Sequence, residues 1–242
     1  MQRILSTMRR AIQDYNMISA GDKIAVGVSG GKDSLTLLAA LQAFKWFSEV
    51  PFDLMGITVD MGFDGVDYTP IKDFCAELGV SYIAKKTDIA EILFDIRKEK
   101  NPCSLCSRMR RGALNDLAKE NGCNKVALGH NNEDVIETFF LSLFYEGRLN
   151  SFSPVTYLSR RELSVIRPLI YAAEADIRGY ARRAKLPIVK NPCPMDGVSK
   201  RQDMKDFIND KTSVDRHFKA RMMNAIQTGL EDWRLTEEKE VK

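Results

Sequence analysis

Hydrophobic residues along this chain follow two spacings: short continuous apolar runs, and longer stretches with an apolar residue at every third or fourth position. The short runs are typical of buried parallel strands, and the longer stretches are typical of amphipathic helices. This pattern predicts strands at 24–28, 54–59, 81–84, 125–129 and 163–169. It predicts helices at 34–47, 71–78, 105–119, 133–145 and 173–184. Because strands and helices alternate, we expect an α/β fold with an open, mostly parallel sheet and helices on both faces.

The two ends of the chain carry helical patterns of their own. Apolar residues at helical spacing predict an amphipathic N-terminal helix within residues 2–18, namely Ile4, Leu5, Met8, Ile12 and Tyr15. Its apolar face is expected to pack against the rest of the protein or against a second copy in a homodimer. A charged stretch after Gln202 predicts a C-terminal helical tail. The expected division is an N-terminal extension at 1–20, an α/β domain at 21–190 and a C-terminal segment at 191–242.

Composition refines this picture only slightly. The chain has 242 residues, of which 44% are hydrophobic and 29% charged, and this suits one large α/β domain with extensions. A formal net charge of +3 permits nucleic-acid binding without requiring it. No apolar stretch approaches the roughly 20 residues of a membrane span, and residues 1–10 lack the apolar segment of a signal peptide. We therefore expect a cytoplasmic protein that does not bind a membrane.

A glycine-rich loop joins the strand at 24–28 to the helix that follows it. Its sequence is Ser29-Gly30-Gly31-Lys32-Asp33-Ser34. Two adjacent glycines let successive backbone amides converge on an anion, and the start of a helix adds free N–H groups and partial positive charge. We expect the loop to bind phosphate, with Lys32 adding a point charge and Asp33 serving a cation or the helix cap. The hydroxyls of Ser29 and Ser34 can donate hydrogen bonds to phosphate oxygens.

The spacing within this loop separates it from the commoner nucleotide-binding loops. A Walker A loop has a glycine five residues before its Gly-Lys pair, where this chain has Val26. The order of strand, Ser-Gly-Gly-Lys-Asp-Ser and helix resembles the pyrophosphate-binding loop of the PP-loop ATPases, which have the HUP fold of adenine nucleotide α-hydrolase-like proteins. That resemblance implies an enzyme that cleaves ATP between its α and β phosphates and adenylates a substrate.

Polar residues follow two further strands. Asp60 and His130 come directly after the strands at 54–59 and 125–129. Because ligands of open α/β sheets bind beyond the carboxyl ends of the strands, we expect both residues to contact ATP in one crevice with the loop. Asp134 either faces this crevice, where it aligns Mg²⁺ or the substrate base, or belongs to a solvated first helical turn. The residues expected to take part in catalysis are Lys32, Asp33 and Asp134.

Three of the five cysteines form a pattern. Cys103 and Cys106 make a C-x-x-C pair at the start of a helix, and Cys193 lies 87 positions further on, after a second Asn-Pro pair. Helix amides and nearby arginines favour the thiolate form of such a pair. Thiolates there suit a redox pair, a zinc site or iron–sulfur ligands. A structural zinc site needs four protein ligands, whereas three cysteines on a [4Fe–4S] cluster leave one iron open for an exogenous ligand.

The segment around these cysteines resembles the tRNA 2-thiocytidine synthetases, the TtcA group of PP-loop enzymes. Pro-Cys-Ser-Leu-Cys-Ser-Arg at 102–108, Gly-His at 129–130 followed by an acidic Thr-Phe-Phe helix, and Ile-Arg-Pro-Leu at 166–169 carry the likeness. The resemblance implies that Cys103, Cys106 and Cys193 hold a [4Fe–4S] cluster. The chain departs from the family at Asp196, where the family commonly has the last cysteine of a second C-x-x-C pair. The Asp196 carboxylate is therefore a candidate ligand for the fourth iron. Asn131 also replaces a histidine or basic residue of the family.

Basic residues supply the expected RNA contacts. Arg108 and Arg111 share one helix face beside the cysteine pair, and Arg167 belongs to the Ile-Arg-Pro-Leu segment. Arg110 is expected to point elsewhere. The implied partners are tRNA and a sulfur donor, either sulfide or a cysteine desulfurase persulfide. The two remaining cysteines, Cys75 and Cys123, are interpreted as structural.

The resemblance implies ATP-dependent thiolation of tRNA. ATP and Mg²⁺ would adenylate the C2 oxygen of an anticodon-loop cytidine, and sulfur delivered through the cluster would replace it. Two alternatives stay open. One is another PP-loop tRNA modifier that forms 2-thiouridine or lysidine, and the other is a metal-bearing nucleotide-binding protein without thiolase activity.

Overall fold

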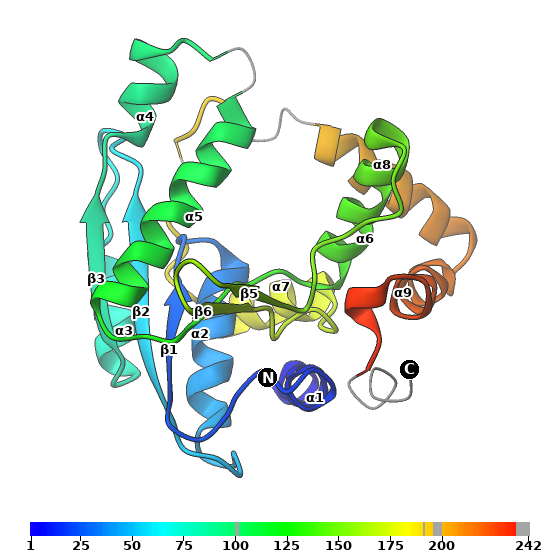
Figure 1. Ribbon diagram of the computed structural model, residues 1–242, viewed down its shortest axis with the longest axis horizontal. Coiled ribbons are helices and arrows are strands. Elements are labelled where there is room, and N and C mark those ends of the chain that lie inside the picture. The colour runs from blue at the N-terminus through cyan, green and yellow to red at the C-terminus, as the bar shows by residue number, and fades with distance from the viewer. Residues whose placement is uncertain (100–101, 191, 196–199, 236–242) are drawn as a thin grey trace.

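The computed structural model describes residues 1–99, 102–190, 192–195 and 200–235, and these residues form one twisted sheet of six strands with helices around it (Figure 1). The strand order is β3-β2-β1-β4-β6-β5. All neighbouring strands are parallel except β5, which runs antiparallel to β6 at one edge. The strands are β1 (Asp22–Gly27), β2 (Phe52–Asp60), β3 (Ser81–Lys86), β4 (Lys125–Ala127), β5 (Val155–Leu158) and β6 (Leu163–Ile166).

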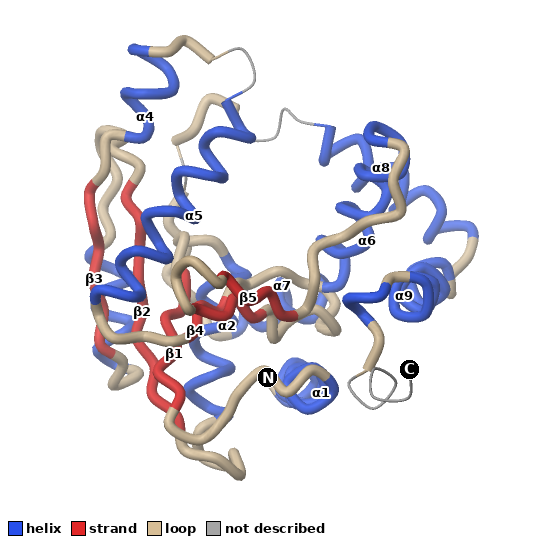
Figure 2. The backbone as a smooth tube through the Cα atoms, in the orientation of Figure 1, coloured by secondary structure: helices blue, strands red, loops and turns tan. Residues whose placement is uncertain are grey.

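Helices cover both faces of the sheet and extend beyond one of its edges (Figure 2). They are α1 (Gln2–Asp14), α2 (Lys32–Phe44), α3 (Thr69–Glu77), α4 (Ile89–Glu91), α5 (Pro102–Glu120), α6 (Asn132–Leu141), α7 (Glu174–Arg183), α8 (Lys200–Val214) and α9 (Phe218–Gly229). Two π-helical turns, η1 (Ile92–Ile96) and η2 (Ser142–Glu146), extend α4 and α6. A 3₁₀ turn, η3 (Glu231–Trp233), follows α9.

The alternation of side chains along β1 shows why the sheet needs helices on both faces. Ile24 and Val26 belong to the larger core, which includes residues of α2 and α7. Ala25, between them, belongs to a second core with Leu114 and Leu117 of α5. Successive strand residues point to opposite faces, so an apolar run without polar interruption requires cover on each side. The predicted α/β class and parallel sheet are confirmed.

Three elements were not expected from the sequence. Strand β5 is four residues long, and all of its residues are at least partly exposed, so it carries no apolar run. Helix α4 and turn η1 together cover only Ile89–Glu91 and Ile92–Ile96. The predicted C-terminal tail consists of two helices, α8 and α9, instead of one continuous stretch. Short elements of this kind depend on tertiary packing more than on local pattern.

Helices near both ends of the chain pack into the larger core. Met8 of α1, Ile208 of α8 and Met223 of α9 are buried there together. The apolar face of α1 therefore packs against the protein's own fold and is not free to form a dimer interface. The homodimer and the three-part division of the chain stay predictions. None of the described helices is both long and apolar enough to cross a membrane.

We expect Trp233→Ala to destabilise the fold strongly. Trp233 is 1% exposed, its ring meets that of Tyr15 edge-on with 6.0 Å between centroids, and its carbonyl accepts a 3.0 Å hydrogen bond from the Tyr15 hydroxyl. Urea denaturation should show a free energy of unfolding lower by about 3–5 kcal/mol. Trp46→Ala is the control, because Trp46 is 87% exposed and its loss should change this free energy by less than about 0.5 kcal/mol. Equal effects of the two substitutions would contradict the packing described here.

Candidate active site

The loop between β1 and α2 is closed by its own hydroxyl groups. The Ser34 hydroxyl donates to the Gly31 carbonyl at 3.0 Å and accepts from the Ser29 backbone N–H at 3.1 Å. Gly30 has φ of +84°, and a Cβ there would lie 3.1 Å from the Cβ of Val189. Glycine is needed at this position because other residues rarely adopt such a φ. The loop therefore presents backbone amides at the start of α2, as the sequence predicts.

The two charged residues of the loop are held by neighbouring elements. The Lys32 ammonium lies 2.8 Å from the Asp33 carboxylate and 3.0 Å from Glu174 at the start of α7. Burial opposes the charge of Lys32, but these two carboxylates outweigh it and raise the pKa of Lys32. The other Asp33 oxygen accepts a 3.1 Å hydrogen bond from the Asn131 side chain. Lys32 is thus charged and already near the position where a phosphate would replace its carboxylate partners.

The corner between β4 and α6 packs directly on this loop. A Cβ on Gly129 would lie 2.9 Å from the Asp33 carbonyl carbon and 3.0 Å from the Ser34 backbone nitrogen. Asn131 caps α6, since its side chain accepts from the Asp134 N–H at 3.2 Å while its own N–H donates to the Asp134 carboxylate at 2.9 Å. This capping box fixes Asp134 at the start of α6, beside Asp33.

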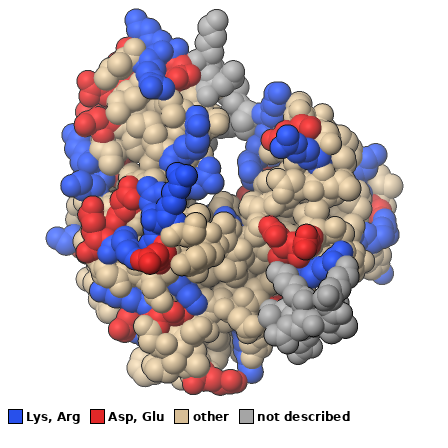
Figure 3. All heavy atoms as spheres, viewed as in Figure 1, with Lys and Arg blue, Asp and Glu red and all other residues tan. Residues whose placement is uncertain are grey.

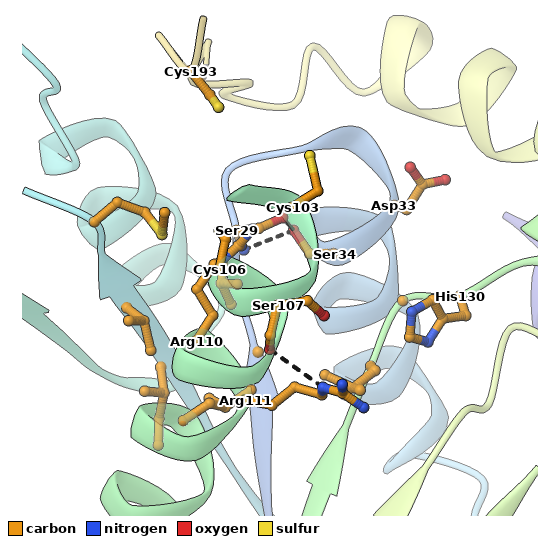
Figure 4. Close-up of a pocket in the computed structure, with 18 of the residues that line it drawn as sticks. Ser29, Asp33, Ser34, Cys103, Cys106, Ser107, Arg110, Arg111, His130 and Cys193 are labelled. Carbon is orange, nitrogen blue, oxygen red and sulfur yellow. Dashed lines mark hydrogen bonds between the residues drawn. The ribbon is translucent and has the colours of Figure 1, made fainter. Parts of the chain in front are cut away.

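A cavity of about 530 Å³ opens beyond the carboxyl ends of β1 and β4 and brings together residues distant in the sequence (Figure 4). One wall is the phosphate loop, another is α5, and the segment after α7 adds a third. The polar and sulfur-bearing residues that line it include Ser29, Asp33, Ser34, Cys103, Cys106, Ser107, Arg110, Arg111, His130, Asp134 and Cys193. The expectation that loop, strand ends and cysteines share one crevice therefore agrees with this geometry.

The three cysteines predicted as ligands all line this cavity. Cys103 is exposed, while Cys106 and Cys193 are half-buried. Burial raises the pKa of the Cys106 thiol, as do the charges of Cys193 and Cys103, whereas Arg110 acts against this rise. In Figure 4 the side chains of Cys103 and Cys193 extend into the same space. Cys75 is buried elsewhere in the core, and desolvation raises its pKa to about 11, which agrees with a structural role.

The three thiols can be compared with two kinds of metal site. Among the described residues, no three His, Cys, Asp or Glu side chains lie close enough together to hold a single metal ion. A zinc ion would need its ligands around one centre, at about 2.3 Å from each sulfur. In a [4Fe–4S] cluster each thiolate binds a different iron, so three thiols spread around one cavity fit that group. Asp196, the candidate fourth ligand, lies outside the described residues.

Asp33 and Asp134 also border a second cavity of about 250 Å³ on the side of α8. Arg201 of α8 reaches the Asp134 carboxylate at 3.3 Å and the Glu137 carboxylate at 3.2 Å. Burial, reinforced by the charge of Asp134, raises the pKa of Glu137 to about 7 even though Arg201 opposes this. Lys205, one turn further along α8, contacts Glu174 at 3.1 Å. Basic residues of α8 therefore pair with three acidic residues near the phosphate loop.

Two residues predicted as ligand contacts are used otherwise in this structure. The Asp60 carboxylate accepts a 2.9 Å hydrogen bond from the Gly62 N–H and does not line the cavity. Arg167 is 7% exposed, and its guanidinium donates to the Ser153 carbonyl and to the Thr156 hydroxyl. A buried guanidinium with protein partners cannot reach RNA. We therefore correct its expected role to that of a structural group that fastens the segment leading into β5.

His130 does line the cavity, as predicted, although its environment keeps it neutral. Burial, together with the positive charge of Arg167, lowers the pKa of His130 to about 3. Its ring lies 4.6 Å from the ring of Phe152, and its Nδ1 has no hydrogen-bond partner among the described residues. A neutral ring of this kind can accept or donate a hydrogen bond to a bound nucleotide, but it cannot supply positive charge.

Sequence reasoning missed several site residues. Arg110 lines the cavity, contrary to the expectation, whereas Arg108 is exposed and does not. The sequence does indicate the position of Arg110, because a residue seven positions after Cys103 lies on the same helix face. Glu174, Arg201 and Lys205 had no such signal, because they meet the loop only through tertiary packing.

Comparisons with known proteins agree with this geometry. Residues 3–218 match the family described as the PP-loop domain. A tRNA-cytidine(32) 2-sulfurtransferase from Pelobacter propionicus is 36% identical over 93% of this chain and 85% of its own length. One from Cereibacter sphaeroides is 39% identical over 86% of this chain and 72% of its own length. The U34-tRNA thiolase NcsA from Methanococcus maripaludis, solved with its [4Fe–4S] cluster, superimposes with a TM-score of 0.77 at 25% identity, covering 93% of this chain and 78% of that one.

These likenesses establish the class of protein. The fold and the loop are those of a PP-loop domain, and the chain belongs to the PP-loop family and, within it, to the tRNA-cytidine(32) 2-sulfurtransferases. The predicted resemblance and the prediction of a transferase enzyme are confirmed.

We expect Gly129→Ala to weaken ATP binding at least tenfold. The added Cβ meets backbone atoms of Asp33 and Ser34, which cannot rotate away, so the phosphate loop itself must shift. Misplacement of a positioned group by about 1 Å costs on the order of 100-fold in catalysis. Isothermal titration with ATP checks this. Gly112→Ala in α5 is the control, because nothing lies within 4 Å of its Cβ and ATP affinity should be unchanged.

Glu137→Gln should change how stability depends on pH. The folded pKa of Glu137, about 7, exceeds its ordinary value of 4.5, so the wild type loses stability as the pH rises between these two values. The glutamine variant lacks this titration. Urea denaturation at pH 5, 6, 7 and 8 checks this. As the pH rises, the free energy of unfolding of the variant should increase relative to that of the wild type, by up to about 3 kcal/mol. Glu120→Gln, at an exposed position of α5, should show no such trend. If the free energy of unfolding of Glu137→Gln differed from that of the wild type by the same amount at every pH, the result would contradict the raised pKa.

Proposed function

We propose that this protein uses ATP to thiolate tRNA, and that it replaces the C2 oxygen of an anticodon-loop cytidine with sulfur. The observation that carries the proposal is one cavity lined both by the phosphate loop and by Cys103, Cys106 and Cys193. The sulfurtransferase relatives support tRNA as substrate and cytidine as target. The thiolase NcsA, whose structure holds a [4Fe–4S] cluster, supports iron–sulfur chemistry in this fold.

ATP activates the base because a carbonyl oxygen is a very poor leaving group. In the proposed first step the C2 oxygen attacks the α-phosphorus of ATP, and pyrophosphate leaves. The amides of residues 29–34 and the Lys32 ammonium stabilise the charge that develops on pyrophosphate. Asp33 and Asp134 both border the cavity and are proposed to hold Mg²⁺, which prefers carboxylate oxygen. A sulfur nucleophile then attacks C2, and AMP departs with the original oxygen.

The sulfur site is proposed on the three cysteines. Cys103, Cys106 and Cys193 would hold a [4Fe–4S] cluster, which when bound supplies one iron without a cysteine ligand for the incoming sulfur. Arg110 faces the same cavity and favours the thiolate form of Cys106, the form that binds iron. The nearby Arg111 is well placed to contact an RNA phosphate, and Arg108 lies exposed one turn before it. The immediate sulfur donor, either sulfide or a persulfide, and the cytoplasmic location stay predictions.

A uridine target is the alternative that a specific observation favours. NcsA, which this chain resembles at a TM-score of 0.77, is a U34-tRNA thiolase. Cytidine and uridine both carry a C2 oxygen, so the same adenylation and sulfur transfer serve either base. Cytidine is preferred because the more similar relatives, at 36% and 39% identity, are named for it.

Cysteine variants test the proposal in cells and in solution. In cells whose own copy is replaced by Cys103→Ser, Cys106→Ser or Cys193→Ser, mass spectrometry of tRNA nucleosides should show loss of 2-thiocytidine. The purified variants should lose iron and sulfide but still release pyrophosphate from ATP in the presence of unmodified tRNA. Cys123→Ala, which removes a buried thiol outside the cavity, should keep 2-thiocytidine. Loss of a 2-thiouridine instead would favour the alternative, and unchanged thiolation in all three variants would reject the role of the cysteines.

A further inference from the structure

Two aromatic side chains lie exposed at the end of α6, on the π-helical turn η2. Phe144 is 54% exposed and Tyr145 is 47% exposed. The ammonium of Lys200, the first residue of α8, lies 4.1 Å from the centroid of the Tyr145 ring. We call Phe144, Tyr145 and Lys200 the aromatic platform. None of the three lines either cavity described above, and the proposed thiolation chemistry uses none of them.

One ring of this platform, that of Phe144, is supported from within the protein. Phe144 stacks on Phe140 with 5.5 Å between ring centroids and meets Phe207 of α8 edge-on at 5.8 Å. Phe140 in turn is buried in the larger core. Aromatic rings held in this way lose little conformational entropy when a partner stacks on them. The one acid of the turn, Glu146, accepts a hydrogen bond from Ser142 at 3.1 Å, inside the turn.

The platform is connected to the proposed active site through α6 and the start of α8. Arg201, the neighbour of Lys200, contacts Asp134 at 3.3 Å, and Asp134 lines the cavity. Tyr145 lies eleven residues after Asp134, which corresponds to about 16 Å along the helix axis. Figure 3 shows a central hollow with Lys and Arg side chains gathered over α5 on one side and over α8 on the other. A negatively charged, flexible partner that enters the cavity from this face would meet both groups of cations.

We propose that the aromatic platform binds single-stranded RNA, by stacking an unpaired base of the same loop that carries the reacting nucleotide. Exposed aromatic rings with an adjacent cation match the two surfaces of a splayed nucleotide, its flat base and its phosphate. The arginines of α5 across the hollow provide complementary charge for the same strand. A protein sulfur donor is a less suitable occupant, because the cations on both sides are not matched to an apolar interface. This inference rests on the proposed tRNA substrate and adds where on the protein the RNA loop is held.

The test measures binding of an unmodified anticodon stem-loop RNA to the full protein by fluorescence anisotropy, over a range of salt concentrations. Tyr145→Ala should weaken binding about tenfold, since removal of one stacking ring typically has this effect. Tyr145→Phe keeps the ring and should bind like the wild type. Lys200→Ala should weaken binding and lower the slope of log affinity against log salt by about 1, as expected for one lost phosphate contact.

The matched control is Trp46→Ala. Trp46 is 87% exposed and follows the end of α2 that lies away from the phosphate loop, so RNA affinity should be unchanged. ATP affinity should be the same in all four variants. Equal RNA affinity of the wild type and Tyr145→Ala would overturn the platform while leaving thiolation intact, whereas absence of RNA binding by the wild type would overturn the proposed function itself. Thiolation by Tyr145→Ala should also be compared between a protein persulfide donor and sulfide. If it falls only with the protein donor, the platform binds that donor and the proposal is overturned.

Discussion

The close approach of two backbone segments is the constraint on which the rest of the site depends. Gly129, after β4, lies against the backbone of Asp33 and Ser34 at the start of α2 with no room for a Cβ. Because β1 and β4 are parallel neighbours, their carboxyl ends meet at the same edge of the sheet. The absence of one side chain at Gly129 lets the phosphate loop and the start of α6 form a single surface. Asp33 and Asp134 line the same cavity for this reason.

Charge then connects this surface to the C-terminal helices. Lys32 shares Glu174 with Lys205, and Arg201 joins Asp134 to Glu137. Each of these carboxylates forms an ion pair with a cation that a phosphate would also attract. Under the proposed function, ATP would exchange protein partners for ligand partners at Lys32, and Glu174 would keep Lys205 as its counter-ion. Buried charges with alternative partners avoid the cost of an unpaired ion in either state. Helix α8 is thus part of the site although it lies far from the loop in sequence.

The sequence alone predicts an element or a site residue correctly wherever the contacts that determine it are local. The helix or strand character of most elements, the phosphate loop and the position of Cys103 and Cys106 at the start of α5 follow from spacing within a few residues. Arg110 was misjudged, although its helical register with Cys103 contained the answer. Strand β5 and the roles of Arg201 and Glu174 were not predictable, because nothing within their own segments indicates which distant residues they contact. Asp60 was assigned to the ligand from its position at a strand end, but its carboxylate caps the turn to Gly62.

The arrangement of α5 places the thiols proposed for sulfur transfer beside the phosphate loop. Its C-terminal half packs on the sheet through Leu114 and Leu117 and is fixed by that core. Its N-terminal half extends past the strand ends, where Cys103 and Cys106 face the cavity. A helix is stiff over this length, so packing at one end determines where the thiols lie at the other. Only Cys193 must be brought in by a separate segment, and the backbone bond from the Val189 N–H to the Gly30 carbonyl, at 3.0 Å, ties that segment to the phosphate loop. The phosphate loop therefore helps to position the third thiol as well as the nucleotide.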